Sequence, residues 1–440
     1  MTSPTARLAG APAADVGLLR ERAADCDERV AALPPKPART PEEQAAADAA
    51  QRPVRALRAE FLRLHGRAVY DEVTAGRTLR PRLAELATAA AERFPGLVPD
   101  RSRLAAEEVL PQAHKEGLAI DHGVFFRQLL ADPVTGGHLL DSMRAPTARA
   151  QELLPEFART GELDLGTVRV LRDGATAHVT LANTGCLNAE TNELAVDLET
   201  AVDLALLDDA VEAGVLRGAP MNHPRYAGKR VFSAGINLKH LHAGRISYLD
   251  FLLGREFGLV SKLRRGLWSG DRSPDSWPHL DLAKPWVAAV DTFAIGGGMQ
   301  ILLAVDHVVA EEDAYFSLPA AQEGIVPGMG NLRLTALFGG RLTRQVILGG
   351  RRIDARDPAA ALVSDEVVAA EGVGAAAATA AERLASPAVA VNRRMIDLAE
   401  EPPEQFRAYA AEFALAQALR LHSADVLSKV SRFSLAGRAG

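Results

Sequence analysis

The hydrophobic positions in the first 160 residues recur every three or four residues, which is typical of amphipathic helices. One clear set is Val54, Leu57, Phe61 and Leu64. The start of this helix has a capping-box pattern, with Thr40 as the N-cap, Pro41 at the first helical position and Glu43 three residues after the cap. The pattern predicts an all-helical N-terminal extension over residues 1–160.

Three arginines lie between the apolar positions of this predicted helix: Arg55, Arg58 and Arg63. Arginine is rarely buried in proteins. We therefore expect these side chains on a solvated helix face, in preference to an anion-binding site.

From about residue 161 the pattern changes to short apolar runs that are separated by glycine-containing turns. Apolar residues that alternate on both sides of Arg172-Asp173-Gly174 predict a β-hairpin. The elements expected after it are a helix over about Thr191–Ala210, strands at Val215 and Arg230–Phe232, a helix over Tyr248–Leu263 and a buried strand over Trp286–Val290. This alternation predicts an α/β core over residues 161–385. A helical C-terminal segment, 386–440, follows and is broken by Pro402-Pro403.

Composition narrows the class of protein. The chain has 440 residues, of which 48% are hydrophobic and 24% charged, and its net charge is −6. This charge provides no global basic field for nucleic acid or an anionic membrane. Two cysteines and the absence of metal-ligand spacing argue against a disulfide scaffold or a metal site. With no signal peptide or membrane span in the sequence, we expect a cytoplasmic protein.

Two glycine-containing segments are candidates for chemistry, Phe232–Leu238 and Ala294–Gln300. Glycine lets the backbone approach a ligand closely, and a helix N-terminus presents N–H groups without intrahelical partners. Two such N–H groups directed at one point stabilise an oxyanion. The alternative is that these glycines only permit tight turns.

The two segments occur together with two more, Phe316–Gly328 and Arg351–Val367, and in this order they resemble the crotonase (enoyl-CoA hydratase/isomerase) superfamily over about residues 166–368. The resemblance implies a spiral of ββα units, an acyl-CoA substrate, and homo-oligomers that are trimers or hexamers. It also implies that the thioester oxygen lies between the backbone N–H groups of Ile236 and Gly297.

Two positions depart from the hydratases of this superfamily. Where those enzymes carry two glutamates, this chain has Gln300 and Ala320. Neither side chain titrates, so the acid–base chemistry of hydration is not available. The resemblance further implies a dry pocket for O₂, formed by Leu238, Ala320, Ile325 and Val426, although such apolar residues are usually core.

The helical extension, the loop 221–226 and Gln300 make the whole chain similar to the cofactor-independent arylacetyl-CoA dioxygenases of glycopeptide-antibiotic pathways. This resemblance implies conversion of 3,5-dihydroxyphenylacetyl-CoA and O₂ to the arylglyoxylate and CoA without metal or flavin. Alternatives are an acyl-CoA thioesterase or hydrolase that consumes no O₂, and a non-enzymatic scaffold or RNA binder.

The same resemblance assigns roles to individual residues. Glu190, Arg255 and Gln300 are expected to hold the ring hydroxyls. The residues expected to contact CoA are His223, Pro224, Arg225, Tyr226 and Lys239, and those expected to line the substrate are Ala234, Gly235, Asn237, Gly296 and Gly298. Two other interpretations stay open, a helix-capping role for Glu190 and a surface ion pair between Arg255 and Glu256. The base that removes the α-proton is not identified by the sequence.

Overall fold

The computed structural model describes residues 8–270, 277 and 281–429. The chain forms two compact units. The helical unit contains Met1–Ser142, Leu241–Leu249 and Arg407–Gly440, and the α/β unit contains Met143–His240 and Asp250–Phe406. The segment that starts at Arg407 therefore belongs to the same unit as the N-terminal segment. The division into three consecutive segments, 1–160, 161–385 and 386–440, stays a prediction.

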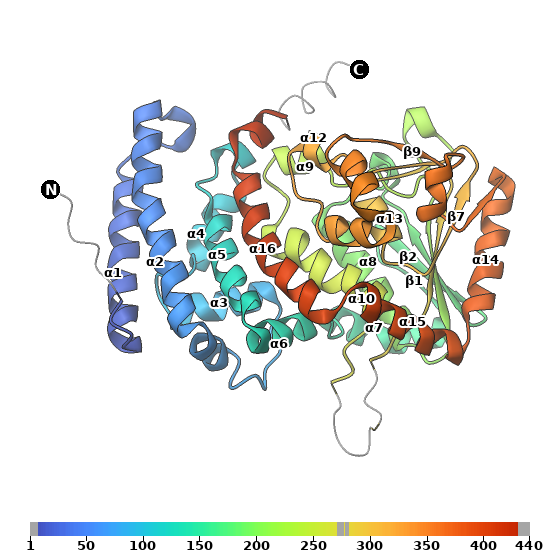
Figure 1. Ribbon diagram of the computed structural model, residues 1–440, viewed down its shortest axis with the longest axis horizontal. Helices are drawn as coiled ribbons and strands as arrows, with labels where there is room; N and C mark the ends of the chain where they lie inside the picture. Colours follow the sequence, from blue (N-terminus) through green and yellow to red (C-terminus); the bar gives the residue numbers. More distant parts are fainter. Residues whose placement is uncertain (1–7, 271–276, 278–280, 430–440) are drawn as a thin grey trace. The chain divides into compact units, whose positions relative to one another are not determined.

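The helical unit is built mainly from seven helices (Figure 1): α1 Pro12–Ala31, α2 Pro41–Val73, α3 Leu83–Arg93, α4 Arg101–Glu108, α5 Leu118–Ala131, α6 Pro133–Met143 and α16 Pro403–Leu421. The predicted capping box at the start of α2 is confirmed. Glu43 N–H donates to the Thr40 hydroxyl at 3.2 Å, and Thr40 N–H donates to the Glu43 carboxylate at 2.8 Å. Helix α5 packs closely on α16, because a Cβ on Gly123 would lie 2.9 Å from Cβ of Ala418.

The expectation of a solvated arginine face on α2 is wrong for Arg58. Its side chain is buried and forms an ion pair with Asp121 of α5 at 2.9 Å. Its Nε also donates to the carbonyl oxygen of Gly96 at 2.8 Å. A buried guanidinium is stable only when it is paired and hydrogen-bonded, and these partners are 38 or more residues away in the chain.

The α/β unit contains a seven-stranded sheet with the strand order β1-β2-β3-β4-β5-β7-β10. Its strands are β1 Glu162–Asp164, β2 Val168–Asp173, β3 Thr176–Leu181, β4 Ala213–Gly218, β5 Trp286–Val290, β7 His307–Glu311 and β10 Glu366–Val368. β1, β2 and β3 pair antiparallel, and every pair from β3 onward is parallel. The predicted hairpin and the buried strand β5 are therefore confirmed.

A second, three-stranded sheet has the order β6-β8-β9, with β6 Phe293–Ile295, β8 Tyr315–Ser317 and β9 Ile353–Asp354. Helix α8 (Asn192–Leu207) packs on β2 and β3, and α14 (Val373–Leu384) packs on β4, β5 and β7 (Figure 1). The other α-helices are α7 Ala148–Thr160, α9 Leu238–His242, α10 Ser261–Arg265, α11 Gly297–Leu302, α12 Ala320–Glu323, α13 Gly330–Ile347 and α15 Pro387–Glu400.

Two predicted elements differ in detail. Residues 230–232 form no ladder; Arg230 makes only an isolated bridge to Pro220. The predicted helix over Tyr248–Leu263 is present, but most of it has π geometry, in segments η5 (Tyr248–Leu253) and η6 (Arg255–Val260). Short π-helical stretches are rare and frequently occur at functional sites.

Candidate active site

Three segments of the α/β unit run side by side at the candidate site. Ser233 forms a parallel bridge with Ala294, and Ile236 forms a parallel bridge with Glu190. The turns that follow these bridges therefore lie together, although they are about 60 residues apart in the chain. This arrangement brings the two glycine-containing segments next to each other, with Glu190 beside them.

The backbone pairing leaves two N–H groups available in these turns. Glu190 N–H donates to Gly235 O at 2.7 Å and Asn237 N–H donates to Glu190 O at 2.9 Å. In a parallel pair of this kind, the N–H of the intervening Ile236 is directed away from Glu190. Gly297 is the first residue of α11, so its N–H has no acceptor within the helix.

Steric contacts explain the glycines at two of these positions. Gly296 has φ +55° and ψ −118°, a conformation in which a side chain is strained. Gly297 packs against Glu190, and a Cβ there would lie 2.2 Å from Oε2 of that carboxylate. The glycines therefore do more than permit a tight turn, because one of them makes room for a buried acid.

Arg255 is at the centre of the polar side chains of the site. Its guanidinium contacts both oxygens of Glu190, at 2.8 Å from Nε and 2.9 Å from Nη2. Nη1 donates to Glu256 at 2.6 Å and to the amide oxygen of Gln300 at 3.1 Å. Nη2 also donates to the carbonyl oxygen of Gly297 at 2.7 Å. The structure thus brings together Glu190, Arg255 and Gln300, which the resemblance had grouped.

Burial by itself lowers the pKa of the Arg255 guanidinium, but the adjacent carboxylates of Glu190 and Glu256 more than offset this effect and raise the pKa above its usual value. Arg255 is therefore a permanent cation between two acids.

The geometry rules out two interpretations that the sequence left open, the helix-capping role of Glu190 and the surface ion pair of Arg255 with Glu256. Thr191 caps α8, by accepting from Leu194 N–H at 3.2 Å, so Glu190 does not.

Arg255 and Glu256 are not a surface pair either, because they are only 4% and 3% exposed. Glu256 is not among the site residues that the sequence predicts. Adjacent residues on an ordinary α-helix point in different directions, so the sequence carries little signal that both are buried.

The residues expected to contact CoA lie in an exposed part of the chain. Pro224–Tyr226 form a 3₁₀ turn, capped by the His223 ring, which accepts from Arg225 N–H at 3.3 Å. The Arg225 guanidinium lies 5.6 Å from the centre of the Tyr226 ring. Lys239 is exposed on α9, and Asn237 accepts from His240 N–H at 3.1 Å at the start of that helix.

The residues expected to form an oxygen pocket belong to different units. Ala320 is buried in the α/β unit, where Leu238 and Ile325 are partly buried, and Val426 is buried in the helical unit. Their common pocket stays a prediction.

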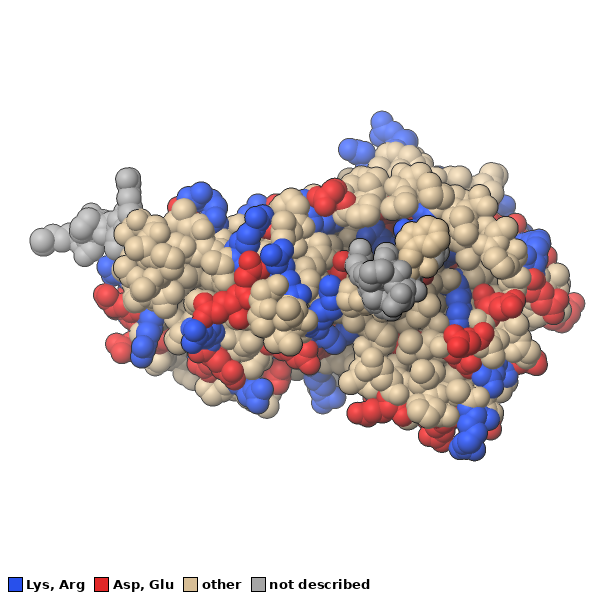
Figure 2. All heavy atoms as spheres, turned by 90° about the horizontal axis from the view of Figure 1, so that it is seen from below, with Lys and Arg blue, Asp and Glu red and all other residues tan. Residues whose placement is uncertain are grey.

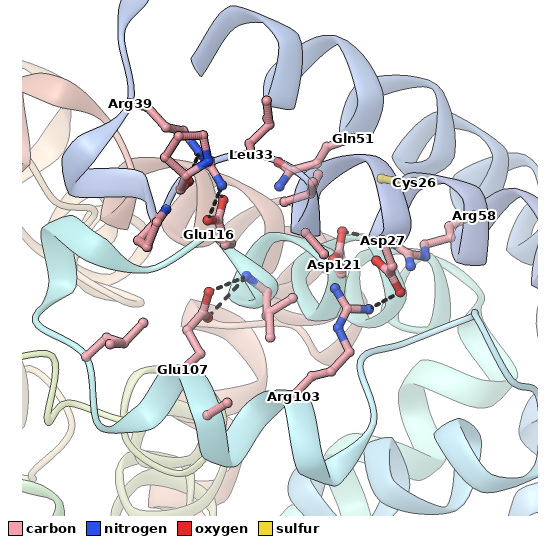
Figure 3. A pocket seen from close by; sticks show the side chains of 17 residues that line it. Cys26, Asp27, Leu33, Arg39, Gln51, Arg58, Arg103, Glu107, Glu116 and Asp121 are labelled. Atoms are coloured by element: carbon pink, nitrogen blue, oxygen red, sulfur yellow. Dashed lines mark hydrogen bonds and ion pairs between the residues drawn. The ribbon is translucent and has the colours of Figure 1, made fainter. Parts of the chain in front are cut away.

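The helical unit contains a cavity of about 570 Å³ for which the sequence carries no signal (Figure 3). Three arginine–carboxylate pairs line it, Arg39–Glu116, Arg58–Asp121 and Arg103–Asp27. A fourth acid, Glu107, accepts from the backbone N–H of Gly117 at 2.9 Å. Each of these charged groups therefore already has a partner within the protein, and we assign the cavity no chemistry.

Within the described residues, no group of three or more His, Cys, Asp and Glu side chains is arranged to hold a metal ion. The same residues include no helix that is both long and apolar enough to span a bilayer. On the face shown in Figure 2, lysine and arginine side chains lie among aspartate and glutamate side chains.

Comparisons with known proteins agree with this fold. The pattern of the enoyl-CoA hydratase/isomerase family matches residues 270–423. The structure of Pseudomonas aeruginosa OdaA has a TM-score of 0.50 and 23% identity, covering 61% of this chain and 98% of that one. A probable enoyl-CoA hydratase of Rhizobium meliloti is 31% identical over 56% of this chain and 90% of its own length. These likenesses define a crotonase-fold protein, as expected.

The likeness extends over the complete chain in one relative. The (3,5-dihydroxyphenyl)acetyl-CoA 1,2-dioxygenase of Amycolatopsis orientalis is 52% identical over 438 residues, which is the full length of both chains. The protein belongs to the crotonase (enoyl-CoA hydratase/isomerase) superfamily, and within it to the family of this dioxygenase.

Proposed function

We propose that this protein is a dioxygenase that converts 3,5-dihydroxyphenylacetyl-CoA and O₂ to 3,5-dihydroxyphenylglyoxylate and CoA. The observation that carries the proposal is the 52% identity to a dioxygenase of this name over the whole of both chains, the helical unit included. The polar cluster around Arg255 and the paired turns at Ile236 and Gly297 supply the chemistry that such a reaction needs.

The backbone N–H groups of Ile236 and Gly297 are proposed to hold the thioester oxygen. Loss of an α-proton converts the substrate to an enolate, whose negative charge develops on this oxygen. Preorganised donors of this kind stabilise such a charge by about 3 kcal/mol each. The ring hydroxyls are proposed to lie at the cluster of Glu190, Arg255 and Gln300. Residues 223–226 and Lys239 are proposed to bind CoA.

The reaction balances without an external reductant. The enolate transfers an electron to O₂, and recombination forms a C–O bond and an α-peroxide. The terminal oxygen of the peroxide then attacks the thioester carbonyl and expels CoA as its thiolate. Cleavage of the O–O bond with loss of the second α-proton leaves the α-keto acid. The substrate thus supplies all the electrons, so we propose that neither metal nor flavin takes part.

Gln300 and Ala320 support an oxygenase over a hydratase. The crotonase-type hydratases carry glutamates at these positions, and addition of water requires a general acid and base. Neither residue in this chain titrates. Ala320 instead contributes an apolar surface, which we propose to be part of the O₂ pocket together with Leu238 and Ile325.

We also propose that the protein is a cytoplasmic homo-oligomer. Helix α15 exposes apolar side chains along its length, among them Val391 at 60%, Met395 at 61% and Ile396 at 54%. Exposed apolar groups that cluster on one element are typical of an interface between proteins. A second copy of this chain is the occupant that the superfamily implies.

The test is oxygen uptake by chelator-treated protein that is given 3,5-dihydroxyphenylacetyl-CoA, with free CoA titrated in the same sample. We expect one O₂ consumed for each CoA released, unaffected by the chelator. Release of CoA without uptake of O₂ would replace the dioxygenase by a hydrolase. If the protein neither takes up O₂ nor releases CoA, both activities are contradicted for this substrate.

A further inference from the structure

Three basic side chains of the helical unit, Lys36, Lys115 and His422, form a cluster that lies outside the candidate active site. Lys36 begins the 3₁₀ turn η1 (Lys36–Ala38), Lys115 directly follows the 3₁₀ turn η2 (Gln112–His114), and His422 directly follows α16. Lys115 is buried, while Lys36 and His422 are partly buried. We call these three residues the basic cluster.

Direct contacts bring the basic cluster together. The Nζ of Lys36 donates to the backbone carbonyl oxygen of Lys115 at 2.6 Å. Two residues further along, a Cβ on Gly117 would lie 3.6 Å from Cγ of the His422 ring. The lysine ammonium group and the histidine ring therefore meet the same short stretch of chain, although they come from opposite ends of the sequence.

Most donors of the basic cluster have no acceptor within the described part of the chain. An ammonium group carries three N–H donors. Lys36 uses one of them on the Lys115 carbonyl, and Lys115 uses one on the carbonyl oxygen of Gly244 at 2.6 Å. Both ring nitrogens of His422 are shielded from solvent, and among the described residues neither has a hydrogen-bond partner. Because buried polar groups are nearly always hydrogen-bonded, the cluster has an unmet need for acceptors.

The neighbouring carboxylates do not meet this need. Glu116 forms an ion pair with Arg39 at 2.7 Å, and Glu107 accepts from two backbone N–H groups at the start of α5. Burial lowers the pKa of both lysine ammonium groups, and the nearby acids offset this effect only in part. The positive charge of the cluster is therefore not fully compensated by the protein.

His422 contributes a donor and no charge. Burial lowers its pKa to about 3, and the positive charges of Lys36, Arg55 and Lys115 act in the same direction. The imidazole is therefore neutral at physiological pH, and a neutral imidazole carries one N–H donor. Two ammonium groups and this N–H are the functional groups that the cluster offers to a ligand.

We propose that Lys36, Lys115 and His422 form a binding site for a phosphate group. A phosphate carries a charge of about −2 at neutral pH, which matches the two ammonium groups. Its oxygens supply the acceptors that the three side chains lack, and lysine is a common ligand of phosphate. The site is formed by the helical unit alone and does not depend on the proposed function. Inorganic phosphate and the 3′-phosphate of CoA present the same chemistry to it.

The first test titrates inorganic phosphate into the full-length protein and follows binding by calorimetry at constant ionic strength. We expect saturable binding with a Kd of about 1 mM or lower. Sodium chloride at the same ionic strength should not produce this signal, because chloride cannot bridge several donors at once. Absence of saturable binding would overturn the proposal.

The second test removes donors one side chain at a time. Lys115→Met and His422→Phe keep side chains of similar size, and each should weaken phosphate binding about tenfold or more. The matched control is Lys429→Met, which removes a charge from the same unit at a lysine that faces Asp425. It should leave the affinity unchanged. If the variants at 115 and 422 do not fold, Lys36→Met at a partly buried position decides the question. Equal affinity in the cluster variants and the control would refute the site.

Competition identifies the source of the phosphate group. Dephospho-CoA lacks the 3′-phosphate of CoA and is otherwise identical to it. Displacement of inorganic phosphate by CoA and not by dephospho-CoA would support the site as a ligand of that group. Displacement by neither would support it as a site for free phosphate. Because none of these measurements requires turnover, phosphate binding without O₂ uptake would contradict the proposed dioxygenase and leave this site standing.

Discussion

At the scale of single residues, the site depends on space as much as on charge. Gly297 leaves room for the Glu190 carboxylate, which is in turn held by two contacts to Arg255. The backbone N–H proposed to bind the thioester oxygen and the acid proposed to bind the ring are therefore packed against each other. A change in one displaces the other.

Gly297→Ala should disrupt the packing of the Glu190 carboxylate against the turn at Gly297. The new methyl group would overlap the carboxylate of Glu190, so either the acid or the turn must move. We expect turnover to fall by about 10²–10³-fold, the usual effect of losing one oxyanion donor. Steady-state oxygen uptake measures this effect.

The control is Gly17→Ala in α1, where an added Cβ meets nothing within 4 Å. It should leave turnover unchanged and stabilise the helix by up to about 1 kcal/mol. Wild-type turnover in Gly297→Ala would show that this turn does not contact the reacting thioester.

At the scale of elements, the packing of the helical unit requires neutral histidines. Burial lowers the pKa of His122 in α5 to about 4, and burial, aided by Lys36, lowers that of His422, which follows α16, to about 3. A histidine whose pKa is lowered in the folded state stabilises that state fully above its unfolded pKa of about 6.5. The contribution is lost as the pH falls below that value toward the folded pKa.

The helical unit should therefore be sensitive to acid. Between pH 7.5 and pH 5, we expect the free energy of unfolding to decrease by about 2 kcal/mol for each of these histidines. Urea unfolding followed by circular dichroism at the two pH values measures the loss. His122→Gln should remove about half of it, and an undiminished loss in this variant would exclude His122 as a source.

At the scale of the whole molecule, the proposed oligomer determines which apolar surfaces are covered. Residues Val391, Met395 and Ile396 of α15 are each more than half exposed in the single chain. Such a group of side chains is unfavourable in water unless a partner covers it.

Met395→Asp should weaken self-association, because a carboxylate is costly to bury without a partner. Sedimentation across a range of protein concentrations should show dissociation at concentrations about tenfold or more above those for the unaltered chain. Val109→Asp, at a site in the helical unit that is 81% exposed, is the matched control and should have no effect. Equal association of both variants would exclude α15 from the interface.

Local patterns were sufficient for much of the fold. The capping box at Thr40, the hairpin of β2 and β3, the strand β5 and the helix after Thr191 all follow from residues that are close together in the chain. Their physical causes, N-cap hydrogen bonds and apolar periodicity, act over a few residues and so are visible in the sequence. The order of the glycine-containing segments likewise indicated the superfamily.

Only the tertiary structure decided which charged side chains are buried. Arg58 and the adjacent pair Arg255 and Glu256 resemble surface residues in the sequence, yet all three are buried. Their burial depends on partners that are distant in the chain, such as Asp121 for Arg58 and Glu190 for Arg255. A charge is stable in the interior only where such a partner meets it, and the fold, not the local sequence, places the partner there.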